Sequence, residues 1–260
     1  MENLNETARL PRVSGLNWDG VNYFSTVRHG GVSAGAYASL NLGLHTNDAP
    51  GHVARNRRRL GQELPGEPLW LNQVHGIHVV DADLCGVGSA VPTADAAVTT
   101  QTNRVLAIMT ADCLPVVIAD TDGRALGVAH AGWRGLQKGV LEAMLEHLRA
   151  KRPEATQWRA WIGPAISQRY FEVGADVFSA FVDQDAQTAL FFVEKTARQK
   201  WLADLPGLAR HRLHKAGVAN IELSGCCTYG DAAQFYSYRR ASDTGRLATL
   251  AWLEPGATTA

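Results

Sequence analysis

Residues 105–135 read VLAIMTADCLPVVIADTDGRALGVAHAGWRG, and this stretch decides how the chain folds. It contains three short apolar runs, which are residues 105–110, 115–120 and 125–130. Each run has the length and composition of a buried β-strand. The dipeptide Asp122-Gly123 between the last two runs predicts a hairpin turn, because glycine adopts positive φ angles at little cost. We therefore predict three short strands, the last two of which form a hairpin.

Two reactive side chains lie at the ends of these runs. Cys113 follows the first run, and His130 ends the third. Neighbouring strands can bring such residues to one end of a sheet. A thiolate beside an imidazole is typical of a metal site or of a cysteine nucleophile with a histidine base. An isolated cysteine is often only a small buried hydrophobe. However, Pro115 keeps Leu114 extended, and glycines beside His130 let a ligand approach, so we favour a functional role.

The composition is that of an ordinary globular protein. The chain has 260 residues, of which 46% are hydrophobic, and 25 Lys and Arg balance 25 Asp and Glu. This balance does not favour binding to nucleic acid or to an anionic membrane. We see no signal peptide and no apolar run long enough to span a bilayer. Four cysteines are too few for a disulfide framework, so we expect reduced thiols in a cytoplasmic protein.

Further elements are expected on both sides of the central stretch. We predict strands at residues 21–27, 68–74, 77–80, 158–162, 190–193, 218–223 and 247–252. We predict helices at residues 48–64 with Asp48 as cap, at 134–152, at 200–215, and around Val177 and Phe181. Short strand pairs mixed with helices indicate an α+β fold with mixed sheets. No linker is evident, so we expect one domain over residues 1–260, of which about the first 15 are loosely held.

Two further residues are candidates for a site beside Cys113 and His130. His75 lies in the turn between two predicted strands, where its side chain would stay accessible, and it is a candidate third metal ligand. Asp95 is a lone acid among small residues. It is expected either to cap a turn or to serve as an active-site carboxylate.

Two segments are candidates for binding an anion. Arg28 begins a glycine-rich loop at residues 28–33, where backbone N–H groups and a basic side chain suit phosphate, although a plain turn is the alternative. The helix predicted from Arg134 begins beside His130, so the positive end of its dipole points toward that residue.

Seven motifs occur in a fixed order along the chain. They are NQVHG at 72–76, ADCLPV at 111–116, HAGWRG at 130–135, GP at 163–164, EVG at 172–174, CCT at 226–228 and FYSYRR at 235–240. Together with VRHGGVS and SLNLGLHTND, they resemble the YfiH-type purine nucleoside phosphorylase family. Its members are also called laccase-domain or multicopper polyphenol oxidase proteins and peptidoglycan editing factor. The resemblance covers about residues 20 to 253.

The resemblance implies both a fold and a metal. The fold is a single four-layer α/β/β/α domain with mixed sheets, similar to the catalytic domain of deamidating toxins that carry a Cys-His pair. The implied ligands of one zinc ion are His75, Cys113 and His130. Two imidazoles and a thiolate would leave a fourth tetrahedral position open, as in catalytic zinc sites. Copper would also suit these ligands.

The resemblance implies phosphorolysis of adenosine, inosine, guanosine and methylthioadenosine, and deamination of adenosine. The expected partners are therefore a nucleoside and phosphate. Deamination needs a carboxylate that passes protons to the leaving ammonia, and Glu172 and Asp95 are the candidates. Phosphorolysis needs cations that hold phosphate. The candidates, in order of preference, are Arg28, Arg134, Arg239 and Arg240.

The sequence departs from the family pattern at three positions. Phe171 stands where Tyr is common, Val27 where Thr is common, and Asn47 where Gly is common. None of these departures removes a metal ligand, but they leave the substrate preference open.

Three alternatives to a nucleoside enzyme are considered. Cys113 and His130 would also serve as nucleophile and base of an amidase that edits peptidoglycan precursors such as UDP-MurNAc-amino acids. A copper-dependent polyphenol oxidase is the second, although a multicopper site needs clustered histidines and the nine here are mostly scattered. A binding module without catalysis is the third, and three potential ligands beside glycine-rich loops disfavour it. The chain is expected to be a monomer or a homodimer.

Overall fold

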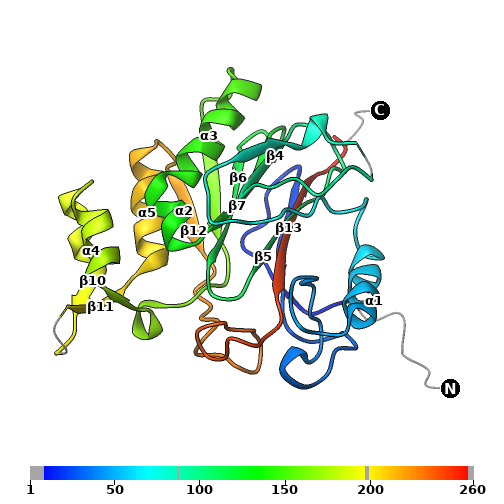
Figure 1. Cartoon of the computed structure of the whole chain (residues 1–260). Coiled ribbons are helices and arrows are strands. Elements are labelled where there is room, and N and C mark those ends of the chain that lie inside the picture. The colour runs from blue at the N-terminus through cyan, green and yellow to red at the C-terminus, as the bar shows by residue number, and fades with distance from the viewer. Residues whose placement is uncertain (1–8, 87, 197–198, 257–260) are drawn as a thin grey trace.

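The strands of the computed structural model form three sheets within residues 9–86, 88–196 and 199–256, the part of the chain that the structure describes (Figure 1). The largest has the order Asn220–Leu223 (β12), Trp158–Ile162 (β8), Leu114–Asp120 (β6), Leu126–Ala131 (β7), Ala96–Thr99 (β4) and Val79–Asp81 (β3). The second has the order Arg12–Val13 (β1), Val21–Thr26 (β2), Leu247–Leu253 (β13) and Leu106–Thr110 (β5). The third has the order Phe192–Glu194 (β10), Lys200–Ala203 (β11) and Glu172–Gly174 (β9).

The α-helices of the described residues lie outside these sheets (Figure 1). They are Pro50–Gly61 (α1), Trp133–Lys138 (α2), Val140–Lys151 (α3), Ala175–Val182 (α4) and Leu205–Lys215 (α5). In the six-stranded sheet, β12 runs parallel to β8 and β3 parallel to β4, whereas the other pairs are antiparallel. This mixture of orientations is what the α+β prediction anticipated.

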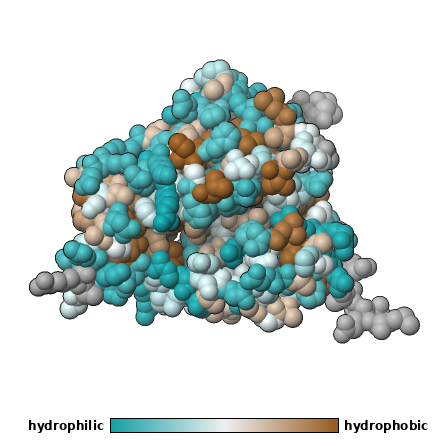
Figure 2. Space-filling view, viewed as in Figure 1, coloured by the Kyte–Doolittle hydropathy of each residue, from teal (hydrophilic) through white to brown (hydrophobic). Residues whose placement is uncertain are grey.

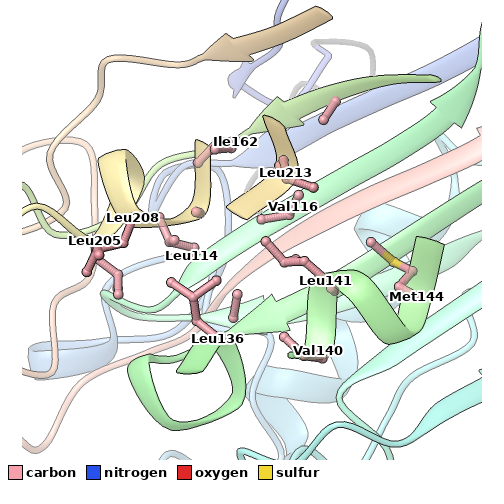
Figure 3. Packing of buried hydrophobic residues seen from close by; sticks show 14 of the residues in the cluster. Leu114, Val116, Leu136, Val140, Leu141, Met144, Ile162, Leu205, Leu208 and Leu213 are labelled. Carbon is pink, nitrogen blue, oxygen red and sulfur yellow. The ribbon is translucent and has the colours of Figure 1, made fainter. Parts of the chain in front are cut away.

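Helices α2, α3 and α5 cover one face of the six-stranded sheet. Leu114 and Val116 of β6 pack there against Leu136 of α2, Leu141 of α3 and Leu213 of α5 (Figure 3). All five side chains are fully buried. Successive residues of a strand face opposite sides of a sheet, so Val117 of β6 points the other way.

The opposite face of the six-stranded sheet packs on the four-stranded sheet. Val117 and Val128 of the first meet Ile108 and Leu253 of the second. The outer face of the four-stranded sheet is covered in turn, because Leu250 of β13 shares a cluster with Leu60 of α1. The layers are therefore α/β/β/α, and the predicted mixed α/β fold is confirmed. Both faces of β6 are covered, which explains why its sequence is continuously apolar.

The predicted hairpin is confirmed, but the first of the three runs lies in a different sheet. Strands β6 and β7 pair antiparallel, and Gly123 in their turn has a φ of 66°. Strand β5 instead pairs with β13. The chain crosses between the sheets at Asp112, whose φ of 104° lies in the left-handed region. The polar break in the sequence therefore marks a change of sheet and not a turn within one sheet.

Two predicted helices are divided in the structure. The one at 134–152 breaks at Gly139, whose φ of 100° ends α2 and precedes α3. The one at 200–215 begins as strand β11, and only the part from Leu205 is helical. Pro206 belongs to the first turn of α5, where its missing N–H has no cost, and Asp204 caps that turn by accepting from Gly207 N at 3.0 Å.

Residues 68–74 do not form the predicted strand. Isolated bridges occur there at Leu69 and Asn72. The Gln73 side chain, in place of its backbone, bonds the edge of strand β5. Its amide donates to the Met109 carbonyl at 2.8 Å and accepts from the Met109 N–H at 2.8 Å. The helix predicted from Asp48 begins at Pro50, with Ala49 at the cap position.

The N-terminal prediction needs a correction in the part that the structure describes. Residues 1–8 lie outside the described residues. From residue 9 onward the segment is held in place, since Leu10 is buried, its N–H donates to Glu63, and β1 pairs with β2. Figure 2 shows a face on which hydrophilic residues predominate and hydrophobic ones lie in small separate groups. None of the helices in the described ranges is both long and apolar enough to cross a bilayer.

Replacing Leu141 by Ala is expected to lower the free energy of unfolding by about 2–5 kcal/mol, because the side chain is fully buried and its removal leaves a cavity. Leu190→Ala is the matched control. Leu190 is 85% exposed, so its replacement should change stability by no more than about 0.5 kcal/mol. Urea unfolding of both variants at equal metal content measures the difference. Equal losses would contradict the packing of α3 described here.

Candidate metal centre

Three side chains from separate parts of the chain meet at one end of the six-stranded sheet. His75 comes from the loop before β3, Cys113 from the crossing between β5 and β6, and His130 from β7. One ligand atom from each lies within 4.8 Å of the others. The His75 Nε2 and Cys113 Sγ atoms are 3.8 Å apart, and the two imidazole ring centres are 4.6 Å apart at an angle of 79°. The predicted meeting of Cys113 and His130 is thus confirmed.

Asp95 forms hydrogen bonds to two of these residues, His75 and His130. Its side chain is fully buried and accepts hydrogen bonds from the backbone N–H groups of Val74, His75 and Gly76 at 3.1, 2.9 and 2.6 Å. It also accepts from His130 Nδ1 at 2.8 Å. Burial alone would raise the pKa of Asp95, but the hydrogen bonds from His130 and from the backbone outweigh it and lower this pKa.

The pKa values of Cys113 and His130 shift in opposite directions. Burial alone would raise the pKa of the Cys113 thiol, but the adjacent His130 and His75 lower it to about 6. Burial alone would lower the pKa of His130, but the Cys113 thiolate and Asp95 raise it to about 9. A thiolate near neutral pH is the form that binds metals or attacks substrates.

The residues present fit a metal ion. A thiolate and two imidazoles are the donors that zinc and copper prefer. Gly132 has no side chain, which leaves space beside His75 and Cys113. A Cβ on Gly132 would lie 2.6 Å from His75 Cδ2 and 3.1 Å from Cys113 Sγ. His130 is oriented by a carboxylate on its other ring nitrogen, as metal-binding histidines usually are.

The three ligands open into a cavity of about 570 Å³. One part of its wall is apolar, and residues that share a core cluster form it: Trp133, Ile166, Phe171 and Leu205. Three arginines also line the cavity, namely Arg134, Arg239 and Arg246. Among the described residues of the wall, Asp112 is the only acidic one. The site is therefore electropositive, with a surface for a flat apolar group.

The structure separates the arginines that we considered for phosphate. Arg134 and Arg239 line the cavity, whereas Arg28 and Arg240 do not. Arg28 donates to the carbonyls of Ala38 and Ala232 at 2.8 and 2.9 Å. Arg240 donates to three backbone carbonyls, which are those of Thr228, Tyr229 and Phe235. The guanidinium groups of Arg28 and Arg240 thus hold loops together.

Glu172 and Asp95, the two candidate proton carriers, both lie off the cavity wall. The Glu172 carboxylate pairs with Lys195 at 2.6 Å and lies 3.9 Å from Lys200 Nζ. Both oxygens of Asp95 accept hydrogen bonds from the chain itself. Three residues that we had not singled out do line the cavity: His45, Tyr238 and Arg246. The first two lie within quoted motifs, but Arg246 stands in a stretch without a recognisable pattern.

Comparison with known proteins gives one matching family model and several relatives of high identity. The family model described as multi-copper polyphenol oxidoreductase laccase matches residues 22–254. The purine nucleoside phosphorylase PA4543 of Pseudomonas aeruginosa is 47% identical over 229 residues, which cover 88% of this chain and 92% of that protein. The purine nucleoside phosphorylase YfiH of Escherichia coli K12 is 46% identical over 236 residues, which cover 90% and 94%.

Solved structures are also similar to this chain over most of its length. Protein NMB0706 of Neisseria meningitidis has a TM-score of 0.87 and 42% identity, and the match covers 94% of this chain and 99% of that one. YlmD of Geobacillus stearothermophilus has a TM-score of 0.81 and 31% identity, with coverage of 92% and 93%. These matches define one family of related enzymes. The chain belongs to this family, the YfiH-type or laccase-domain proteins.

Gly132→Ala is expected to lower the metal bound per chain severalfold, because the added methyl group would lie against His75 and Cys113. Elemental analysis for zinc and copper measures this, with His75→Ala as the variant that loses a ligand. Gly61→Ala is the matched control, since a Cβ there would meet no heavy atom within 4 Å. Wild-type metal content in Gly132→Ala, with a folded far-UV spectrum, would show that the ligands do not need this space.

Proposed function

We propose that this protein cleaves purine nucleosides by phosphorolysis, with one zinc ion held by His75, Cys113 and His130. The cavity carries the proposal, because it combines a His-Cys-His group with arginines and an apolar wall. The names of the related phosphorylases support the same activity. Adenosine, inosine, guanosine and methylthioadenosine are the proposed substrates. The four cysteines are unpaired, which fits a protein of the reducing cytoplasm.

The cavity wall suits both substrates of such a reaction. Trp133 and Phe171 offer aromatic surface against which a flat purine packs favourably, and Ile166 and Leu205 extend that surface. The arginines of the wall provide the positive charge that holds phosphate. Arg239 is fixed in place, because its Nη1 donates to the Glu172 carbonyl at 2.8 Å and its backbone N–H donates to Asp112 at 2.6 Å.

The bond changes of phosphorolysis define what the residues must do. The bond between C1′ of the ribose and N9 of the purine breaks, and its electron pair goes to the purine. An oxygen of hydrogen phosphate forms the new bond to C1′, and the proton of hydrogen phosphate ends on the purine. Fixed arginines hold the anionic nucleophile beside the sugar and stabilise its charge. A bound zinc ion would supply a Lewis acid that stabilises developing negative charge.

Deamination of adenosine has less support in the geometry. It requires a carboxylate that passes protons near the metal ligands. The Glu172 carboxylate is paired with Lys195, and the Asp95 oxygens are occupied by backbone N–H groups and His130. Phosphorolysis needs neither group as a proton carrier, so it remains the main proposal.

Inosine with phosphate is expected to yield hypoxanthine and ribose 1-phosphate. Chromatography of the products, with and without phosphate, measures this in zinc-loaded wild-type protein. Omission of phosphate should abolish base release, since phosphate is the nucleophile. Free ribose in place of the phosphorylated sugar would mean that water is the nucleophile, and it would contradict the proposal.

A second function is favoured by one observation, the spatial arrangement in which His130 lies between Asp95 and Cys113. His130 Nδ1 is bonded to the Asp95 carboxylate, and its other nitrogen is free to serve the Cys113 thiol. This arrangement is also that of a nucleophilic cysteine with a histidine base and an orienting carboxylate. An amidase that edits peptidoglycan precursors would use it without metal.

Alkylation of Cys113 distinguishes the two functions. A thiolate bound to zinc is shielded, whereas a free thiolate beside a histidine reacts quickly. Cys113 is expected to resist iodoacetamide in zinc-loaded protein and to react after chelation, as followed by mass spectrometry with Cys226 and Cys227 as internal comparisons. Fast labelling of fully zinc-loaded protein, with an acyl adduct on Cys113 after a cell-wall precursor is added, would favour the amidase. Slow labelling before and after chelation would contradict both functions.

Multicopper oxidation has the least support. Such an enzyme needs one electron-transfer copper and a separate three-copper cluster, and hence several groups of histidines. Within the described residues, His75, Cys113 and His130 are the one group of three or more metal-binding side chains whose ligand atoms converge. Copper in this one group is chemically reasonable, given its donors and the family description.

A further inference from the structure

Arg246 is a partly buried cation without an acidic partner in the described part of the chain. It precedes β13 and lines the cavity that contains Cys113. Its Nη1 donates to the carbonyls of Thr244 and Gly245 at 2.9 and 3.0 Å. Its Nε and Nη2 atoms make no hydrogen bond to the described residues. The side of the guanidinium formed by Nε and Nη2 is therefore free for a ligand.

The position of Arg246 is built by the chain around it. A Cβ on Gly43 would lie 2.7 Å from Arg246 Cγ, so the glycine lets its loop pack against the stem of the arginine. The backbone N–H of Arg246 donates to Asn41 at 2.9 Å, and its carbonyl accepts from Leu42 N at 3.2 Å. The guanidinium lies 5.8 Å from the centre of the Tyr238 ring. These contacts fix its direction before any ligand arrives.

Other basic side chains lie near Arg246. Arg57 is partly buried nearby, where it donates to the Leu42 carbonyl at 2.9 Å and stacks on Trp70. Burial lowers the pKa of Arg246, although the nearby Cys113, Tyr238 and Asp112 act in the opposite direction. Partial burial, followed by the charges of Arg246 and Arg57, lowers the pKa of His45. Removing cations from water without a counter-ion is costly, so an anion would relieve this cluster.

Asp112, the acid of the cavity wall, contributes negative charge near Arg246 but accepts its hydrogen bonds from other groups. Asp112 accepts from Thr228 Oγ1, from Ser237 Oγ and from the backbone N–H of Arg239, at 2.7, 3.0 and 2.6 Å. It is buried among these donors. It also directly precedes Cys113, so the segment that carries Arg239 is tied to a metal ligand.

We propose that Arg246, with His45 and Arg239, forms a subsite for a phosphate oxyanion in the same cavity as the metal ligands. The free Nε and Nη2 of Arg246 match two oxygens of a phosphate group, and a neutral His45 adds one donor at the rim. Arg239 carries the second positive charge. This subsite rests on the proposed phosphorolysis for its role, and it names the residues that hold the second substrate.

Arg246→Gln is expected to raise the KM for phosphate about tenfold or more, because a charge-assisted pair of hydrogen bonds is lost, with little change in the KM for inosine. Arg246→Lys keeps the charge without the planar pair of donors, so its KM for phosphate should lie between those of Arg246→Gln and wild type. Arg55→Gln is the matched control, since Arg55 is exposed on α1 away from the cavity. Zinc content and far-UV spectra are matched first.

Direct binding separates failure of the subsite from failure of phosphorolysis. The stabilisation of each protein by inorganic phosphate, at constant ionic strength, is measured by thermal unfolding. Stabilisation that Arg246→Gln abolishes supports the subsite even when wild type forms no ribose 1-phosphate, and in that case only the proposed function fails. Unchanged phosphate KM and unchanged stabilisation in Arg246→Gln would overturn the subsite while phosphorolysis stands.

A parallel measurement with inosine 5′-monophosphate identifies the source of the oxyanion. Stabilisation by this nucleotide alone, lost in Arg246→Gln, assigns the subsite to a phosphate ester carried by the substrate. Stabilisation by free phosphate assigns it to the co-substrate. Failure of both ligands to stabilise wild-type protein would overturn the proposal.

Discussion

The buried carboxylate of Asp95 is the interaction on which the site depends. It fixes the turn that carries His75 through three consecutive N–H groups, and it fixes the ring of His130 through Nδ1. One group therefore positions two of the three candidate ligands. Because Nδ1 of His130 is occupied, Nε2 is the nitrogen left for a metal or for the thiol. A carboxylate this deeply buried is stable only with all its partners, so the turn and the ring hold each other in place.

The third ligand is positioned by the crossing of the chain from one sheet to the other. Strands β5 and β6 are consecutive but belong to different layers, and Asp112 adopts a left-handed backbone where the chain passes between them. Its side chain binds segments around Thr228 and Ser237. Cys113, the next residue, therefore lies where the two sheets and the C-terminal loops meet. The cavity lies at this junction, and residues from several parts of the chain line it.

Local patterns predicted the parts of the fold that depend on local physics. The apolar runs of β6 and β7 and their Asp122-Gly123 turn were evident, since buried strands and hairpin turns have characteristic residues. The pairing of β5 with β13 was not, because nothing near residues 106–110 encodes a partner about 140 residues away. The role of Gln73 was not predicted for a related reason, since the sequence does not show that its side chain, and not its backbone, bonds the edge of β5. The candidate ligands His75, Cys113 and His130 stood out because their chemistry is rare outside metal and nucleophile sites, whereas Arg246 is one of many basic residues.

What distinguishes a structural arginine from a binding one is how its donors are used. Five N–H groups in a rigid fork can all be satisfied by backbone carbonyls, as Arg240 nearly shows with its three acceptors. Such a side chain connects loops and has few free N–H donors for a ligand. Arg246 uses one nitrogen for the chain and leaves the rest facing a cavity without a free acid. The fold thus bears the cost of a desolvated charge beside the metal ligands, and an arrangement of this kind is stable when an anion shares the cavity.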